Sequence, residues 1–217
     1  IKYDSAGNAR WAKSIGGSST DEINSVAETS DGGYIAGGEF ISSSIDLGNG
    51  VTLNKNSSYD GMIIKYDSEG NAQWSKAIGG SNSDYINSVA ETSDGGYVVG
   101  GHFLSESIEL GNGVTLNNNG FQDGMIIKYD SAGNAQWARA IGGDGADYIY
   151  SVVETRDGGI IAGGRFSSIS IDLGNGVTLN SNNSANKGMI IKYDSAGNAQ
   201  WAKSIGGSIN DYINSVA

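Results

Sequence analysis

One sequence unit of about 63 residues recurs along this 217-residue chain, and the repeat constrains the fold more than any other feature. The string Ile-Lys-Tyr-Asp marks the start of each copy, at Ile1, Ile64, Ile127 and Ile191. In repeat proteins each unit is one supersecondary structure that buries its apolar face against its neighbours. We therefore expect residues 1–217 to form a single repeat array, with repeats 1–63, 64–126 and 127–190 and a partial repeat 191–217.

Turn signals divide each copy into short β segments. In the second copy, stretches rich in Gly, Asn and Asp separate the segments that we expect to be strands, namely residues 61–66, 72–78, 85–92 and 97–103. Glycine in such turns supplies the positive φ angle that tight hairpins require. No window shows the apolar spacing of three and four residues that is typical of a helix. The sequence therefore predicts an all-β fold.

Four antiparallel strands per repeat are typical of one β-propeller blade. Named from the axis outward, the expected strands of one blade are residues 84–92, 97–103, 124–129 and 135–141. By this count the chain contains three full blades plus partial ones, which are an outer pair in residues 1–15 and an unpaired inner strand in residues 211–217. A closed ring needs about 4–8 blades, so we expect an arc or fragment of a larger propeller or array. A parallel β-helix would need shorter rungs and fewer hairpins.

Each repeat also carries an extra hairpin, which we call the arm. In the first copy, two short apolar segments flank Gly48-Asn49-Gly50, and Asn-Gly is the strongest short hairpin signal. Ile45, Leu47, Val51 and Leu53 would share one face of this hairpin, because side chains alternate along a strand. We expect the arm to bury that face on its own blade.

Three motifs connect the repeat to a known group of proteins. They are Trp-x-Lys-x-Ile-Gly-Gly at residues 74–80, Asp-Tyr-x-x-Ser-Val at 84–89 and Glu-Thr-x-Asp-Gly-Gly-Tyr-x-x-Gly-Gly at 91–101. The pattern resembles the bladed repeats of the SBBP type found in bacterial secreted and surface proteins. This resemblance covers every copy and implies a propeller fold with an extracellular or cell-surface location. The arm departs from the commoner members, and most members are of unknown role.

The composition excludes several classes of function. With 24 acidic and 13 basic residues the net charge is −11, which repels nucleic-acid phosphates and anionic lipids, so neither nucleic acid nor membrane is an expected partner. The absence of Cys excludes disulfides, zinc fingers, iron–sulfur clusters and thiol catalysis. No apolar run approaches the ~20 residues of a membrane helix. Because the chain begins at Ile1 without a methionine, we expect a processed product or an excised fragment.

One position carries a different ionisable residue in each copy. Glu39, His102 and Arg165 all lie between Gly-Gly and Phe, and we call them the slot residues. They are the candidate ligand-binding residues, although single charges at strand ends are usually solvated. Because His102 is the only histidine, neither a repeated Ser-His-Asp arrangement nor a His-rich metal site is possible, and no catalytic residue is predicted.

Aspartates that begin the inner strands are the candidate metal ligands. Asp21, Asp84 and Asp147 occupy equivalent positions and are the residues that would bind calcium. Calcium requires several oxygen atoms converging on one point. Aspartate in turns usually accepts hydrogen bonds from its own backbone instead. We therefore expect no cofactor, with calcium as the alternative.

The tryptophans and the paired glycines are expected to serve packing. Trp11, Trp74, Trp137 and Trp201 lie in mid-strand, two residues before Lys or Arg, a spacing that favours packing between neighbouring blades over sugar stacking. The glycine pairs, such as Gly100-Gly101, lie in a strand and do not precede a helix. They favour close approach of an adjacent backbone over phosphate binding.

The copies keep the tight turns and vary one set of loops. The variable loops are residues 18–20, 81–83, 144–146 and 208–210, together with 55–60, 118–123 and 181–187. We predict a non-enzymatic extracellular or cell-surface scaffold that presents these loops to a glycan or a surface protein, as in adhesion. One alternative is a structural building block that self-associates through its open end strands into a filament or layer. A glycan-active enzyme is the other alternative.

Overall fold

The computed structural model describes residues 1–181 and 185–217, and none of these residues lies in a helix. Short antiparallel strands joined by tight turns and loops make up this part of the chain, which confirms the predicted all-β fold. Within it there is accordingly no helix long and apolar enough to cross a membrane. Residues 182–184, part of the predicted variable loop 181–187, lie outside the described residues.

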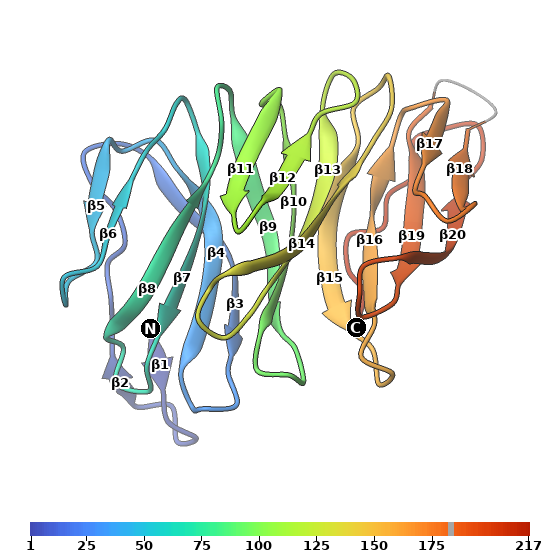
Figure 1. Cartoon of the computed structure of the whole chain (residues 1–217). Coiled ribbons are helices and arrows are strands. Elements are labelled where there is room, and N and C mark those ends of the chain that lie inside the picture. Colours follow the sequence, from blue (N-terminus) through green and yellow to red (C-terminus); the bar gives the residue numbers. More distant parts are fainter. Residues whose placement is uncertain (182–184) are drawn as a thin grey trace.

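The described residues form three four-stranded antiparallel sheets in succession along the chain (Figure 1). The first contains β3 (Asp21–Glu28), β4 (Tyr34–Phe40), β7 (Asp60–Tyr66) and β8 (Ala72–Ile78). The second contains β9 (Asp84–Glu91), β10 (Tyr97–Phe103), β13 (Asp123–Tyr129) and β14 (Ala135–Ile141). The third contains β15 (Tyr148–Glu154), β16 (Ile160–Phe166), β19 (Lys187–Tyr193) and β20 (Ala199–Ile205). The strand order in each sheet is the one predicted for a blade, and the sheets do not close into a ring (Figure 1).

The arms form as predicted, one beside each sheet. They are β5 (Ser44–Asp46) with β6 (Thr52–Asn54), β11 (Ser107–Gly111) with β12 (Val114–Asn117), and β17 (Ser170–Asp172) with β18 (Thr178–Asn180). In the first arm Asn49 adopts a φ of 56° at the hairpin tip, and its Nδ2 donates to the Ala72 carbonyl at 3.1 Å. Ile45 and Leu53 are buried in the core of the same blade. Each arm therefore covers its own blade.

The paired glycines allow two different close approaches. A Cβ atom at Gly100 would lie 2.7 Å from Cγ1 of Val152 on the next blade, so the first glycine makes room for the neighbouring blade. A Cβ atom at Gly101 would overlap the Tyr85 carbonyl oxygen, so the second glycine makes room for the inner strand of its own blade. The predicted close backbone approach is confirmed.

Consecutive inner strands are joined by a repeated serine contact. The Ser88 hydroxyl accepts a hydrogen bond from the Val152 N–H at 3.1 Å. The same contact joins Ser25 to Val89 at 3.1 Å, and the Ser151 hydroxyl accepts from the Val216 N–H at 3.2 Å. This contact gives an otherwise unpaired backbone N–H a partner and sets the spacing of the blades.

Trp11, Trp74 and Trp137 pack on the following copy, as predicted, whereas Trp201 is 41% exposed. Trp137 Nε1 donates to the Ser195 carbonyl of the following copy at 3.0 Å, and its ring lies against Gly197. The Arg139 guanidinium lies 5.6 Å from the Trp137 ring, beside the same turn. Trp11 contacts the turn at Ser68 and Gly70 in the same manner.

The two ends of the chain carry partial blades, as predicted. The outer pair at the start is β1 (Lys2–Tyr3) and β2 (Ala9–Trp11), which is shorter than the predicted 1–15. The segment 211–217, predicted as an unpaired inner strand, pairs with no second strand among the described residues. It is held on the third sheet, where the Ile213 N–H donates to the Gly164 carbonyl at 3.1 Å.

Candidate functional site

The slot residues lie near the loop face, which we define as the end of the sheets that carries the arms and the variable loops. Glu39, His102 and Arg165 each lie one residue before the end of β4, β10 and β16. All three are half-buried. They are therefore not freely solvated strand ends, which was the simpler interpretation of the sequence.

A β-bulge in the inner strand supplies each slot residue with a partner. The pairing register shifts at Asn24, Asn87 and Tyr150, which lie opposite the glycine pairs. Asn24 Nδ2 donates to Glu39 Oε2 at 2.5 Å, and Asn87 Nδ2 lies 3.2 Å from His102 Nδ1. A β-bulge inserts one extra residue into a strand, and this changes the direction of its side chain so that it can reach a particular neighbour.

The same bulge residues reach the next blade. Asn24 Nδ2 also donates to the Ile86 carbonyl at 2.9 Å, and Asn87 Nδ2 donates to the Ile149 carbonyl at 2.7 Å. In the third copy the bulge residue is Tyr150 instead of asparagine, and the slot residue is Arg165. Burial raises the pKa of Tyr150, whereas the charge of Arg165 and a hydrogen bond with Arg165 oppose the rise. The bulge residue is thus asparagine beside both Glu39 and His102, and it is tyrosine beside Arg165.

Rings from successive copies stack around the slot residues to form what we call the ring row. His102 lies 4.7 Å from Tyr85 in a stacked arrangement and 4.6 Å from Tyr148 of the next blade. The Arg165 guanidinium lies 4.1 Å from the Tyr148 ring and 5.5 Å from the Tyr212 ring. Such cation–ring contacts are attractive because the ring face is negative. The complete ring row is Tyr59, Tyr85, His102, Tyr148, Arg165 and Tyr212.

The electrostatics of the slot differ from copy to copy. Burial, with a smaller contribution from the Arg165 charge, lowers the pKa of His102 to about 3, so its imidazole is neutral at physiological pH. Burial also raises the pKa of Glu39, and the nearby Glu22 carboxylate adds to the rise. Arg165 Nε is buried without a hydrogen-bond partner among the described residues.

The three calcium candidates lie in loop-closing networks. Asp84 Oδ1 accepts from the Leu104 and Ser105 N–H groups at 3.2 and 3.1 Å. Its Oδ2 accepts from the Ser105 hydroxyl at 2.6 Å and from the Gly80 N–H at 3.0 Å. Asp21 and Asp147 have the same set of donors. These carboxylates tie three loop segments together, and a bound cation would have to displace some of the donors.

A second set of loop-face aspartates is buried with one oxygen unpaired. Asp60 and Asp123 begin the third strand of the first two blades and are fully buried. Their Oδ1 atoms have no hydrogen-bond partner among the described residues. Burial raises the pKa of Asp123 to about 6, and the Asp147 charge adds to this effect. The third blade has Lys187 at this position, and its ammonium donates to the Gly207 carbonyl.

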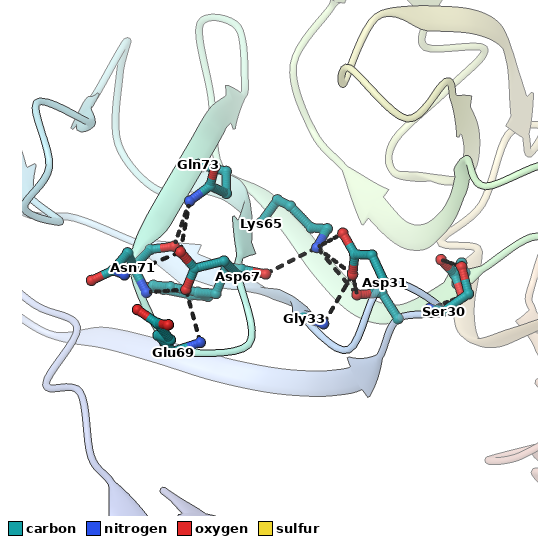
Figure 2. Close-up of polar contacts among 11 residues, drawn as sticks. Ser30, Asp31, Gly33, Lys65, Asp67, Glu69, Asn71 and Gln73 are labelled. Atoms are coloured by element: carbon teal, nitrogen blue, oxygen red, sulfur yellow. Dashed lines mark hydrogen bonds and ion pairs between the residues drawn. The ribbon is translucent and has the colours of Figure 1, made fainter.

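The opposite end of the sheets, which we call the turn face, repeats one polar network in every blade. Figure 2 shows the first copy, in which the buried Lys65 donates from Nζ to both Asp31 oxygens at 3.0 and 2.9 Å and to the Tyr66 carbonyl at 2.9 Å. The Thr29 hydroxyl and Lys65 together lower the pKa of Asp31 to about 2. Lys128 with Asp94 and Lys192 with Asp157 form the same ion pair.

The sequence identified the slot position but missed the partners that give it geometry. Asn24, Asn87 and Tyr150 appear in the sequence as ordinary strand residues, because a bulge depends on the pairing register. The change from asparagine to tyrosine in the copy that carries Arg165 was the available signal. Among the described residues there is no group of three or more His, Cys, Asp or Glu side chains that could hold a metal ion.

Two known proteins are similar to parts of this chain. Regulatory protein FlaEY of Caulobacter vibrioides is 31% identical over 138 residues, which cover 63% of this chain and 14% of that protein. The uncharacterized WD repeat-containing protein L264 of Acanthamoeba polyphaga mimivirus is 30% identical over 118 residues, which cover 52% of this chain and 8% of that protein. The chain thus spans only a small part of the length of either relative.

No family model matches the chain, so its membership of the SBBP type stays a prediction. The similarity to a WD repeat-containing protein agrees with the sheet order, because WD repeats are propeller blades of four strands. The three sheets are therefore those of a β-propeller-like repeat protein, and the similarity to a WD repeat-containing protein agrees with this architecture.

Proposed function

We propose that this chain is a non-enzymatic recognition scaffold of the cell surface, which presents its ring row and variable loops to a partner. The ring row and the loops lie on the same face, and the frame beneath them is nearly constant between copies. Such a division between frame and loops is typical of proteins that bind through their loops. No reaction is part of this proposal.

The observation that supports the proposal most is the variation of one half-buried position of the loop face, beside a turn-face ion pair that does not vary. Glu39, His102 and Arg165 occupy this position, and their bulge partners are Asn24, Asn87 and Tyr150. Free drift is expected at solvated loop residues, whereas each slot residue is half-buried and has a defined partner. The ion pair of the turn face is retained in all three copies.

The arrangement of the rings favours a protein partner over a glycan. Sugars stack on the open faces of aromatic rings. Here the rings of Tyr85 and His102 stack on each other at 4.7 Å, and the Arg165 guanidinium lies over the Tyr148 ring at 4.1 Å. Ring edges, tyrosine hydroxyls and the Arg165 guanidinium remain to meet a ligand. Tyrosine and arginine are the residues that dominate the energetics of protein–protein interfaces. A glycan ligand is the other outcome that the experiment below distinguishes.

The test is binding of the labelled protein to bacterial cells, to the same cells after protease treatment, and to a glycan array. We expect binding that protease removes. The triple variant Glu39→Ala, His102→Ala and Arg165→Ala should weaken this binding at least about tenfold, because side chains central to an interface dominate its affinity. The matched control replaces exposed turn-face residues, one in each turn, with Glu69→Ala, Ser131→Ala and Arg156→Ala, and it should bind as the parent does.

Retained binding by a folded slot triple variant would exclude the ring row as the recognition surface. Protease-resistant binding, together with a signal on the glycan array, would reassign the ligand to a carbohydrate.

A further inference from the structure

A pocket lies on the turn face between the first and second blades, and we call it the junction pocket. Its volume is about 450 Å³, which is within the size range of small-molecule sites. The first blade contributes Trp74 from its outer strand, and the second blade contributes Tyr97 from its second strand. Three carboxylates and one ammonium also line it, some of which Figure 2 shows, and they belong to Asp31, Asp67, Glu91 and Lys65.

Two aromatic side chains in the junction pocket have polar atoms without a partner. The ring centroids of Trp74 and Tyr97 lie 5.6 Å apart, and the ring planes are inclined at 62°. Tyr97 is only 2% exposed, yet its hydroxyl has no hydrogen-bond partner among the described residues. Trp74 Nε1 has none there either, whereas Trp11 and Trp137 donate to a carbonyl of the following copy. Because buried polar groups are normally hydrogen-bonded, the Tyr97 hydroxyl indicates a place for a ligand.

The charge of the junction pocket is negative. Three carboxylates stand against one ammonium, and that ammonium, on Lys65, already lies 2.9 Å from an Asp31 oxygen. Burial raises the pKa of Tyr97 to about 12, and the charges of Asp31 and Glu91 add to the rise. The fields of two carboxylates therefore converge on a neutral hydroxyl, and the same fields would stabilise a positive charge beside it.

The next junction has a cation of its own beside the equivalent tryptophan. There the Arg139 guanidinium lies 5.6 Å from the Trp137 ring, between the second and third blades. None of the described side chains places a cation over the Trp74 ring in this way. The third blade also has Ile160 at the position of Tyr97. The first junction thus has a second aromatic ring where the next junction has an aliphatic residue and an arginine.

We propose that the junction pocket binds a small organic ammonium ion. Its alkyl groups would lie against the rings of Trp74 and Tyr97, because the negative face of an aromatic ring attracts a cation. Its charge would be balanced by Glu91 and Asp67, which lie on either side of the junction. Metal ions such as calcium prefer oxygen ligands, which the two rings do not supply. The junction pocket lies at the opposite end of the blades from the ring row, so this inference does not depend on the proposed recognition function.

The test is a titration of the folded chain with choline, monitored by NMR at the indole N–H resonances of Trp74 and Trp137. We expect the Trp74 resonance to shift with a dissociation constant on the order of 1 mM, and the Trp137 resonance to stay in place. The uncharged isostere of choline, in which carbon replaces nitrogen, should bind at least about tenfold more weakly, because it lacks the attraction to rings and carboxylates. Sodium chloride holds the ionic strength constant, so that general screening produces no shift.

Two variants locate the site. Tyr97→Ile introduces the residue that the third blade has at this position, Ile160, and should weaken choline binding at least about tenfold. Glu91→Gln removes one charge and keeps acceptor and donor atoms for Ser30, and it should weaken binding about threefold. Glu106→Gln is the matched control, because it removes the same charge from an exposed residue outside the pocket, and it should bind as the parent does.

A Trp74 resonance that does not move in about 100 mM choline would overturn the proposal. Equal affinities for choline and its uncharged isostere would do the same, as would equal affinities of the Glu91→Gln variant and the Glu106→Gln control. If Tyr97→Ile does not fold, the comparison of these two glutamine variants decides, because Glu91 is half-buried and Glu106 is exposed.

Discussion

The two ends of each blade are held by different kinds of polar contact. On the turn face, a buried lysine forms an ion pair with an aspartate in all three blades, and in the first two it also donates to a backbone carbonyl. On the loop face, Asp60 and Asp123 are replaced by Lys187 in the third blade, and the slot residues differ in every copy. The turn face therefore keeps the same ion pair in all three blades, whereas the loop face tolerates changes of charge from one copy to the next.

The same residue type titrates in opposite directions at the two ends. Burial opposes the shift at Asp94, but hydrogen bonds from Thr92 and Lys128 lower its pKa to about 2. Burial raises the pKa of Asp123 to about 6, and the Asp147 charge adds to this effect. One of the two Asp123 carboxylate oxygens has no hydrogen-bond partner among the described residues. Position in the blade, not residue type, therefore decides whether a carboxylate stabilises the fold.

The largest effect is expected from Gly101→Ala, which tests whether the loop-face end is as rigid as the turn face. A methyl group there overlaps the Tyr85 carbonyl oxygen, so the inner strand must shift. We expect a loss of about 3 kcal/mol in the free energy of unfolding, measured by urea denaturation. Gly207→Ala is the control, because nothing lies within 4 Å of its Cβ position. Equal stabilities of the two variants would show that the backbone at the loop face shifts to accommodate the methyl group.

Asp123→Asn removes the ionisable group of a buried loop-face carboxylate and tests whether its charge destabilises the fold. The raised pKa means that the folded state binds more protons at Asp123 than the unfolded state does. Protonated Asp123 therefore stabilises the folded state at low pH, and this contribution is lost as the pH rises from about 4 through about 6. We expect the variant to gain about 2 kcal/mol over the parent at pH 8 and little at pH 4. The measurement is urea unfolding across this pH range. A variant less stable than the parent at pH 8 would contradict the assignment.

Lys128→Met should act in the opposite sense on the turn face. It removes the cation beside Asp94 and the donor to the Tyr129 carbonyl. Because the Asp94 side chain is 65% exposed, water screens the pair and we expect a loss of only about 1 kcal/mol at pH 7. The parent should lose the contribution of the ion pair as the pH falls from about 4 to about 2, and the variant should lose less. Identical acid unfolding curves would rule out this role.

The smallest expected effect is the absence of a titration at His102. Its ring is buried between Tyr85 and Tyr148 and its pKa is lowered to about 3, so its proton resonances should not move between pH 5 and 8. The signal is unambiguous because the chain has one histidine. Arg165→Gln should raise the pKa without restoring the ordinary value near 6.5, since burial is the larger cause. A titration near pH 6.5 in the parent would place the ring in solvent.

The sequence predicted the elements that depend on local pattern. The Asn-Gly arm, the blade order and the packing of Trp137 on the next copy follow from turn chemistry, alternation and repeat spacing, and the structure confirms them. Residues 211–217 were predicted as an inner strand without a partner, and no described residue pairs with them as a second strand. The outer pair predicted over residues 1–15 is shorter in the structure, where Lys2–Tyr3 pairs with Ala9–Trp11.

The candidate site was predictable in position and not in structure. The slot residues were recognisable because three copies differ at one place between conserved neighbours. Their partners depend on a bulge, and a bulge is a property of two paired strands, so no single-strand pattern reveals Asn87 or Tyr150. Stacking of Tyr85 on His102 likewise joins two strands, and the contact with Tyr148 joins two blades.

The first glycine of each pair has a consequence for how such genes change length. Gly37, Gly100 and Gly163 each receive the valine and isoleucine of the following copy, so every boundary is encoded partly in one repeat and partly in the next. An unequal crossover between aligned copies joins the first part of one repeat to the last part of another. The recombinant repeat still carries the glycine for its successor and the valine for its predecessor. Arrays of this kind therefore gain or lose whole units by recombination without any boundary having to be redesigned.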